Sequence, residues 1–175
     1  FKNELERSWK TLANLNSISG NSPVKVSVII PFKNNIQLTK NCLQSIYEVT
    51  TKTYSFEIIL VDDASTELFS FESYQMGYGN LRVIRNEKNL GFASSCNLGA
   101  KAANGNYLLF LNNDTLALEG WLENLVTMLE EDPTIGIVGS KLLYDDGRIQ
   151  HAGVVFDDEM MPFRIYPIFP IILAV

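Results

Sequence analysis

The sequence is organised around one stretch, Gly105-Asn106-Tyr107-Leu108-Leu109-Phe110-Leu111-Asn112-Asn113-Asp114-Thr115. From 107 to 111 every side chain is large and apolar or aromatic, and the run then changes abruptly to polar Asn-Asn-Asp. A short apolar run that starts after a glycine and ends in turn-forming residues is typical of a strand buried on both faces of a parallel sheet. The sequence therefore predicts a buried strand over 105–111 with a polar tip at its carboxyl end.

The polar tip, Asn112-Asn113-Asp114, falls where open α/β sheets bind ligands, in the crevice beyond the carboxyl ends of the strands. One carboxylate beside two carboxamides presents several hard oxygen atoms, which suit Mg2+ or Mn2+ together with the phosphate oxygens of a ligand. The alternative is a plain turn whose side chains bond to their own backbone and cap the following helix. Taken alone, the stretch favours the turn, because Asx-rich turns are common at strand ends.

The segments on either side alternate between short apolar runs and amphipathic stretches of helical period. This alternation predicts an α/β fold with right-handed crossovers and a mostly parallel sheet flanked by helices. Pro31 is expected to stop the first strand, and Asn34-Asn35 to cap the helix that follows. The predicted strands are 26–30, 56–61, 81–84, 105–111 and 135–138; the predicted helices are 1–16, 36–48, a short one ending near 76, 93–103 and 119–131; and 141–163 is predicted to form a hairpin or meander.

Carboxylates follow two of the predicted strands at the point where each strand ends. Asp62-Asp63 comes after the second strand and Asp114 after the fourth. The loops after the first, second and fourth strands are expected to open on one edge of the sheet. Carboxylates that converge there repel one another unless a cation or a hydrogen-bond donor lies between them. A nucleoside diphosphate with a metal meets both needs, and we expect only one of Asp62 and Asp63 to cap the next helix, together with Ser65.

The composition is that of an ordinary globular domain. A length of 175 residues fits one domain, and a net charge of -6 with a pI near 4.8 argues against a general nucleic-acid binder. Cys42 and Cys96 fall in predicted helices and are interpreted as reduced core residues of a cytosolic protein. No stretch resembles a signal peptide or a membrane span. Residues 1–24 are interpreted as a helix and linker, and the apolar tail 165–175 as a chain interrupted within its fold.

Four motifs stand in a familiar order: Val26-Ser27-Val28-Ile29-Ile30-Pro31-Phe32-Lys33-Asn34, then Ile59-Leu60-Val61-Asp62-Asp63-Ala64-Ser65-Thr66, then Asn89-Leu90-Gly91-Phe92-Ala93 with Asn97, then Gly105 to Thr115. Over about residues 25–156 the chain resembles the inverting family 2 glycosyltransferases of the GT-A fold, most closely their rhamnosyltransferase-like branch. The resemblance implies a Rossmann-like nucleotide-sugar-binding domain over 25–175, truncated at its C-terminus.

The resemblance also implies a function. The family transfers a sugar from a nucleotide-diphospho-sugar donor to a saccharide or lipid-linked acceptor, with inversion and with a divalent metal, Mn2+ or Mg2+. It implies a part in polysaccharide biosynthesis, in the cytoplasm or peripherally at the cytoplasmic face of the membrane.

The same resemblance assigns the nucleoside side of the site. The loop that begins at Pro31 would lie along the nucleoside, and Asp63 would accept a hydrogen bond from the base ring, with Asp62 beside it. Gly91 would open a helix whose start approaches the nucleotide. The residues so assigned to nucleotide-sugar binding are Pro31, Phe32, Lys33, Asn34, Asp62, Asp63, Gly91, Asn97, Asn112 and Asn113.

On the phosphate side, Asn112-Asn113-Asp114 matches the DxD motif of the family. By that match Asp114 would bind the metal, and Asn113 would face the ribose or the sugar. Asn112 departs from the motif's first aspartate, and a neutral carboxamide contributes less to a hard cation than a carboxylate does.

An inverting transfer needs a general base, usually a carboxylate, to take the proton of the acceptor hydroxyl. In the resembled family this base lies in an acidic motif beyond the region seen here. After His151 the acids are Asp157, Asp158 and Glu159, without a helix-like segment behind them, so we expect the base to lie outside this chain. The alternative is a non-catalytic GT-A-like module that binds a nucleotide sugar or a partner. A nucleotidyltransferase is disfavoured because no Gly-rich loop with a basic residue follows the first strand.

Five further residues each have two interpretations. His151 is either a ligand or acid/base, or a hairpin histidine bonded to backbone, which is the commoner case. Lys141 and Arg148 either neutralise phosphate or are solvated charges. Trp121 and Phe92 are more often core residues than platforms for a sugar.

Overall fold

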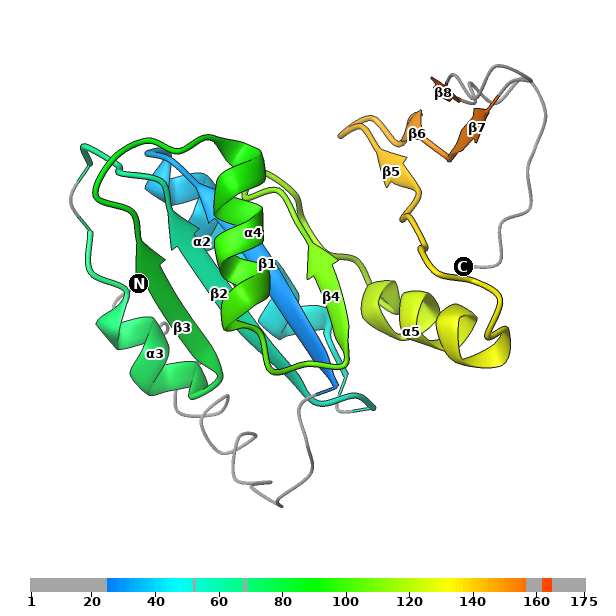
Figure 1. Ribbon diagram of the computed structural model, residues 1–175, viewed down its shortest axis with the longest axis horizontal. Coiled ribbons are helices and arrows are strands. Elements are labelled where there is room, and N and C mark those ends of the chain that lie inside the picture. The colour runs from blue at the N-terminus through cyan, green and yellow to red at the C-terminus, as the bar shows by residue number, and fades with distance from the viewer. Residues whose placement is uncertain (1–24, 52, 68, 157–161, 165–175) are drawn as a thin grey trace. The chain divides into compact units, whose positions relative to one another are not determined.

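The computed structural model describes residues 25–51, 53–67, 69–156 and 162–164 (Figure 1). The predicted helix 1–16 and its linker therefore lie outside the described residues. The chain forms two compact units, the first ending at Ala117 and the second beginning at Leu118.

The first unit is a parallel sheet flanked by helices, as predicted. The sheet has the order β3-β2-β1-β4, and every neighbouring pair in it is parallel. Helix α4 lies across one face and α2 across the other (Figure 1). The strands are β1 (Val26–Phe32), β2 (Phe56–Asp62), β3 (Leu81–Arg85) and β4 (Tyr107–Phe110), and the helices are α2 (Ile36–Val49), α3 (Glu72–Tyr78) and α4 (Phe92–Ala102).

The core of this unit lies on both faces of the sheet, and one part of it lies between the central strands and α4. Ile29 of β1 and Ile59 and Val61 of β2 are fully buried and pack against alanines at the end of α4. The two cysteines, Cys42 and Cys96, are buried free thiols, as predicted. Complete burial of aliphatic side chains on two adjacent strands supplies the main driving force for folding this unit.

Strand β1 continues through Pro31, so the prediction that this proline stops the strand is wrong. The odd-numbered residues of β1 direct their backbone groups toward β4, since the carbonyls of Lys25 and Ile29 accept hydrogen bonds from Tyr107 and Leu111. Pairing with β4 ends at Ile29. A backbone N–H at position 31 would point toward β4, whose pairing with β1 has already ended there. Pro31 therefore removes no hydrogen bond between the two strands.

Strand β4 is not buried on both faces, and that prediction is also wrong. Leu108 and Phe110 are 46% and 50% exposed. Phe110 pairs with Ile29 and shares its face of the sheet, but α4 packs over β1 and β2. As the edge strand of the described sheet, β4 has one strand neighbour, and its side chains on the α4 face are left partly open.

The amino end of the sheet is fixed by one buried carboxylate. Glu57 accepts hydrogen bonds from the Ser27 hydroxyl at 2.7 Å, the Asn104 N–H at 2.7 Å and the Arg82 guanidinium at 2.8 Å. Burial raises the pKa of Glu57, but these hydrogen bonds and the Arg82 charge outweigh it and hold the pKa below its usual value. The N–H of Gly105 donates to Ser27 Oγ at 2.8 Å, so the same network fixes the entry into β4.

Among its described residues, the second unit contains one helix and two pairs of short antiparallel strands, which confirms the predicted helix and the predicted hairpin or meander. Its elements are α5 (Trp121–Glu131), β5 (Leu142–Leu143), β6 (Ile149–His151), β7 (Val154–Phe156) and β8 (Pro162–Arg164), with β5 antiparallel to β6 and β7 antiparallel to β8. The predicted strand 135–138 does not form, and Ile137 is 92% exposed. An apolar run interrupted by Gly136 becomes a strand only where a neighbour accepts its hydrogen bonds.

Candidate nucleotide-sugar site

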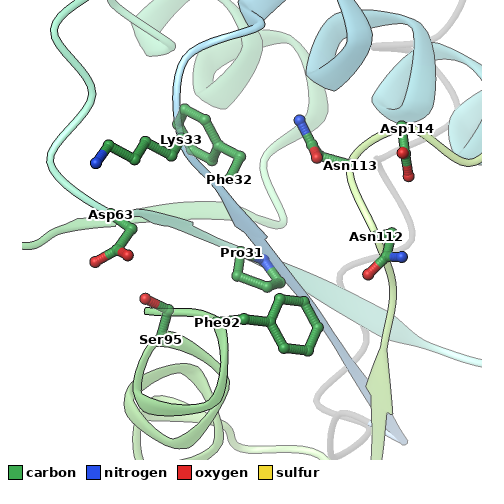
Figure 2. Close-up of a pocket in the computed structure, with 9 residues that line it drawn as sticks. All are labelled: Pro31, Phe32, Lys33, Asp63, Phe92, Ser95, Asn112, Asn113 and Asp114. Carbon is green, nitrogen blue, oxygen red and sulfur yellow. The ribbon is translucent and has the colours of Figure 1, made fainter. Parts of the chain in front are cut away.

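A pocket of about 290 Å³ opens at the carboxyl edge of the sheet in the first unit (Figure 2). Its walls come from the end of β1, the end of β2, the start of α4 and the turn after β4. The lining residues are Pro31, Phe32, Lys33, Asp63, Phe92, Ser95, Asn112, Asn113 and Asp114. The prediction that the loops after the first, second and fourth strands open on one edge is therefore confirmed.

Asp63 joins the end of β2 to the start of α4. Its Oδ1 accepts hydrogen bonds from Asn86 Nδ2 and the Leu90 N–H, both at 2.8 Å, and its Oδ2 accepts from the Gly91 N–H at 2.9 Å. Gly91 precedes α4 with a φ of 83°, a conformation that suits glycine. Burial raises the pKa of Asp63, but these hydrogen bonds outweigh it and keep the pKa below its usual value. Asp63 therefore lines the pocket as an ionised acceptor.

Replacing Asp63 with Asn should make the chain less sensitive to acid. Because the folded-state pKa is lowered, the stabilisation is complete above the unfolded-state pKa, about pH 4, and is lost as the pH falls through the folded-state value. We expect Asp63→Asn to lower the free energy of unfolding by about 2 kcal/mol at pH 7 and by clearly less at pH 3. Urea denaturation at both pH values measures this. An equal loss at the two pH values would show that the carboxylate charge is not responsible.

The carboxylate of Asp62 is bonded to neighbouring residues of the protein. Its Oδ1 accepts from the Ser65 N–H at 2.8 Å and its Oδ2 pairs with the Arg85 guanidinium, which also donates to the Ser65 carbonyl at 2.7 Å. Neither Asp62 nor Asp63 caps α3, whose N-cap is Phe71 without a side-chain bond. The expected cap is therefore wrong: Asp62 closes a turn with Ser65 instead, because the chain turns there long before the helix begins.

Four of the residues assigned to nucleotide-sugar binding do not line the pocket: Asn34, Asp62, Gly91 and Asn97. Asp62 is held by Arg85, and Asn34 is bonded to the loop after β2. Asn97 is exposed on α4. Gly91 contributes its N–H to Asp63. The assigned residues that the pocket brings together are Pro31, Phe32, Lys33, Asp63, Asn112, Asn113 and Asp114.

The stretch Asn112-Asn113-Asp114 forms a turn and also lines the pocket. The Asn112 carbonyl accepts from the Thr115 N–H at 3.3 Å and from the Cys42 thiol at 3.7 Å. Asn113 Nδ2 donates to Thr39 Oγ1 of α2 at 3.0 Å, which fixes the orientation of its carboxamide. Asp114 is exposed; burial and the nearby Asp114 charge raise the pKa of Cys42 to about 12. The turn interpretation and the ligand interpretation are thus compatible.

The donor atoms of this turn fit one kind of metal site. Within the described ranges, no group of three or more His, Cys, Asp or Glu side chains is arranged to hold a metal ion. Mg2+ in sites that handle phosphates commonly takes one or two carboxylates, with the remaining ligands from phosphate and water. Asp114, with the carboxamides of Asn112 and Asn113 beside it in the pocket, fits a cation that is shared with a diphosphate.

Two lining residues, Phe92 and Ser95, are not among the residues assigned to the site from the sequence. Phe92 was interpreted as a core residue more often than a platform for a sugar, but it is 61% exposed, and its ring extends into the pocket beside Pro31 (Figure 2). The signal that marks it is its place directly after Gly91, in the first turn of α4, where a side chain faces the strand ends. Ser95 is buried one turn later, and its Oγ accepts from Asn86 Nδ2 at 3.2 Å.

The remaining candidates belong to the second unit. His151 pairs with Leu142 in the β5–β6 hairpin. Arg148 is bonded to Asp146 through Nε at 2.7 Å, and Lys141 is exposed. Trp121 begins α5. In the part of the chain that the structure describes, no helix combines the length and the apolar character needed to cross a bilayer.

Known proteins have structures similar to this fold. The chain resembles residues 1–349 of S. aureus TarS, with a TM-score of 0.56, 27% identity, and coverage of 62% of this chain and 33% of that TarS chain. The TarS structures include complexes with UDP, at 29% identity and a TM-score of 0.55, and with UDP-GlcNAc. These neighbours are GT-A glycosyltransferases, so the predicted GT-A fold is confirmed.

Sequence comparisons agree. The O-antigen biosynthesis protein RfbC of Myxococcus xanthus is 36% identical over 134 residues, which are 75% of this chain and 10% of RfbC. An uncharacterized glycosyltransferase of Haemophilus influenzae is 35% identical over 114 residues, 65% of this chain and 37% of that protein. The chain thus spans from a tenth to just over a third of these relatives. The model of the family "Glycosyl transferase family 2" matches residues 27–161. With its parallel sheet and a pocket where three strands end, the chain belongs to glycosyltransferase family 2.

Proposed function

We propose that this chain is the donor-binding part of an inverting glycosyltransferase that takes a sugar from a nucleotide-diphospho-sugar. The observation that carries the proposal is that Asp63 lines the same pocket as Asn112, Asn113 and Asp114. Asp63 presents a hydrogen-bond acceptor for a nucleobase, and the turn after β4 presents oxygens for a metal that is shared with a diphosphate. Family membership and the UDP complexes of TarS support this interpretation.

The nucleoside occupies the side of the pocket formed by Pro31, Phe32, Lys33 and Asp63. The carboxylate of Asp63 accepts an N–H of the base, because its lowered pKa keeps it ionised at neutral pH. Phe92 supplies an apolar ring face among the polar lining residues, which suits stacking against the nucleoside. Lys33 is exposed and contributes a positive charge on the nucleoside side of the pocket.

The diphosphate occupies the side formed by the turn after β4. Asp114 would hold Mn2+ or Mg2+, with Asn112 and Asn113 beside it, and the metal would supply positive charge to the leaving diphosphate. Asn113, fixed by Thr39, faces the ribose or the sugar.

The general base is supplied from outside this pocket. The two carboxylates that line it are Asp63 and Asp114. Asp63 is held by Asn86, Leu90 and Gly91, and Asp114 is reserved for the metal. Neither is then available to take the proton of an acceptor hydroxyl from the face opposite the leaving group, as inversion requires.

The acceptor is a saccharide or a lipid-linked molecule, and the transferred group is a hexosyl or a rhamnosyl group. RfbC, whose name refers to O-antigen biosynthesis, supports a role in polysaccharide assembly. For that role we expect the protein to act in the cytoplasm or peripherally at the cytoplasmic face of the membrane.

Calorimetric titration of UDP, GDP and dTDP into the chain, with and without Mn2+, tests the proposal. We expect one nucleotide to bind, and Mn2+ to tighten its binding. The matched titration with the corresponding monophosphate should show much less effect of Mn2+, because the diphosphate completes the metal site. Failure of all three diphosphates to bind would overturn the donor-site assignment.

A further inference from the structure

Asn34 connects the two loops that form the nucleoside side of the pocket. Its side-chain Oδ1 accepts hydrogen bonds from the N–H groups of Thr66 at 2.8 Å and Glu67 at 3.1 Å, and from Thr66 Oγ1 at 3.2 Å. Its own N–H donates to Ser65 Oγ at 2.7 Å. Asn34, in the loop after β1, thus makes four hydrogen bonds to three consecutive residues in the loop after β2.

The backbone at this connection is held in an unusual conformation. Asn34 and Asn35 have φ values of 57° and 51°, and Ala64 in the facing loop has a φ of 58°. Residues other than glycine rarely adopt left-handed φ values, and asparagine does so more readily than most. The predicted side-chain cap of α2 by Asn34-Asn35 is wrong, since Asn35 is the N-cap without a side-chain bond. The oxygen of Asn34 is instead committed to the facing loop.

The connection lies next to the pocket without being part of its lining. Lys33, which lines the pocket, directly precedes Asn34; Asp63, which also lines it, is two residues before Ser65. The loop after β2 is independently anchored, because Arg85 binds both Asp62 and the Ser65 carbonyl. Asn34 therefore ties the less anchored β1 loop to a fixed one.

We propose that Asn34 is a positioning residue, which sets Lys33 and Asp63 at the separation that a nucleoside needs and does not itself contact the donor. This inference rests on the proposed function. A preformed pocket avoids the entropic cost of ordering two loops at the moment of binding. Loss of the Asn34 oxygen should consequently weaken nucleotide binding even though no ligand contact is removed.

Two substitutions separate the oxygen from the backbone conformation. Asn34→Gly keeps the left-handed φ and removes the oxygen, whereas Asn34→Asp keeps both. With the tightest binder among UDP, GDP and dTDP, we expect Asn34→Gly to raise the Kd about tenfold, and Asn34→Asp to remain within about threefold of the native chain. The corresponding monophosphate should lose the same factor, because the tie acts on the nucleoside side.

A control distinguishes positioning from a general loss of stability. Glu57→Gln destabilises the opposite end of the sheet and should leave the Kd unchanged when measured on folded protein. The proposal is overturned if Asn34→Gly binds like the native chain, or if Asn34→Gly and Asn34→Asp are equally weakened, or if Glu57→Gln weakens binding as much. A native chain that binds none of the three nucleotides would instead remove the proposed donor site, and the positioning role with it.

Discussion

Replacing Asp114 with Asn is expected to weaken Mn2+-supported binding of the nucleoside diphosphate by about a hundredfold, since a ligand charge is lost from a metal site with few protein ligands. In the proposed site, Asp114 is the one carboxylate on the metal, and Asn112 and Asn113 are neutral. The fold should tolerate the change because Asp114 is exposed and the substitution preserves shape, so the free energy of unfolding should stay within about 0.5 kcal/mol of the native value. Calorimetry with Mn2+ and urea denaturation measure the two quantities.

The control for this prediction is Asp145→Asn, which removes one exposed negative charge from the turn between β5 and β6. It changes the net charge by the same amount, so it reports any general electrostatic effect on an anionic ligand. We expect it to leave the Kd unchanged. If Asp114→Asn and Asp145→Asn had the same small effect, the assignment of the metal to Asp114 would be wrong.

Replacing Gly105 with Ala is expected to destabilise the first unit by about 3 kcal/mol or more. A Cβ at this position would lie 2.5 Å from the Ser27 nitrogen, 2.7 Å from the Val26 carbonyl carbon and 2.8 Å from Ser27 Oγ. Two of these atoms belong to the backbone of the central strand β1, which is paired on both sides and cannot move without breaking the sheet. The shift would also disturb the hydrogen bond from the Gly105 N–H to Ser27.

Gly136→Ala is the matched control, because a Cβ there would meet nothing within 4 Å. We expect its free energy of unfolding to change by no more than about 0.5 kcal/mol. Thermal or urea denaturation of both variants gives the comparison. Equal stability of Gly105→Ala and the native chain would mean that β4 enters the sheet by another path.

The sheet was predictable because its signals are local. The runs 26–30 and 56–61 are mostly apolar, with Ser27 and Glu57 as the exceptions, and each is followed within a few residues by polar residues, so their strand character follows from the segments themselves. The polar tips after the runs 56–61 and 105–111 led directly to Asp63 and Asp114, which the pocket brings together. These features can be inferred from the residues of each segment, without knowing which segments pack together.

The wrong predictions all concern features that depend on which segments of the chain pack together. Whether Pro31 ends a strand depends on where β4 stops, and whether Leu108 is buried depends on how far α4 extends across the sheet. The run 135–138 has strand-like residues but makes no ladder. Asn34 is of a residue type that often caps helices. Its different role follows from hydrogen bonds to a loop about thirty residues further along the chain, which no local pattern identifies. Residue type predicted the elements, and tertiary contacts decided their limits.

The Glu57 network lies at the amino end of the sheet, whereas the pocket lies at the carboxyl end. Strand β1 has seven residues between them, a separation of roughly 20 Å. Evolution can therefore vary the two ends at different rates: the loops at one end can change to accept a new donor, while the residues at the other end keep the scaffold intact. The same division suits engineering, since a library confined to the loop residues would retain its anchor in Ser27, Glu57 and Gly105.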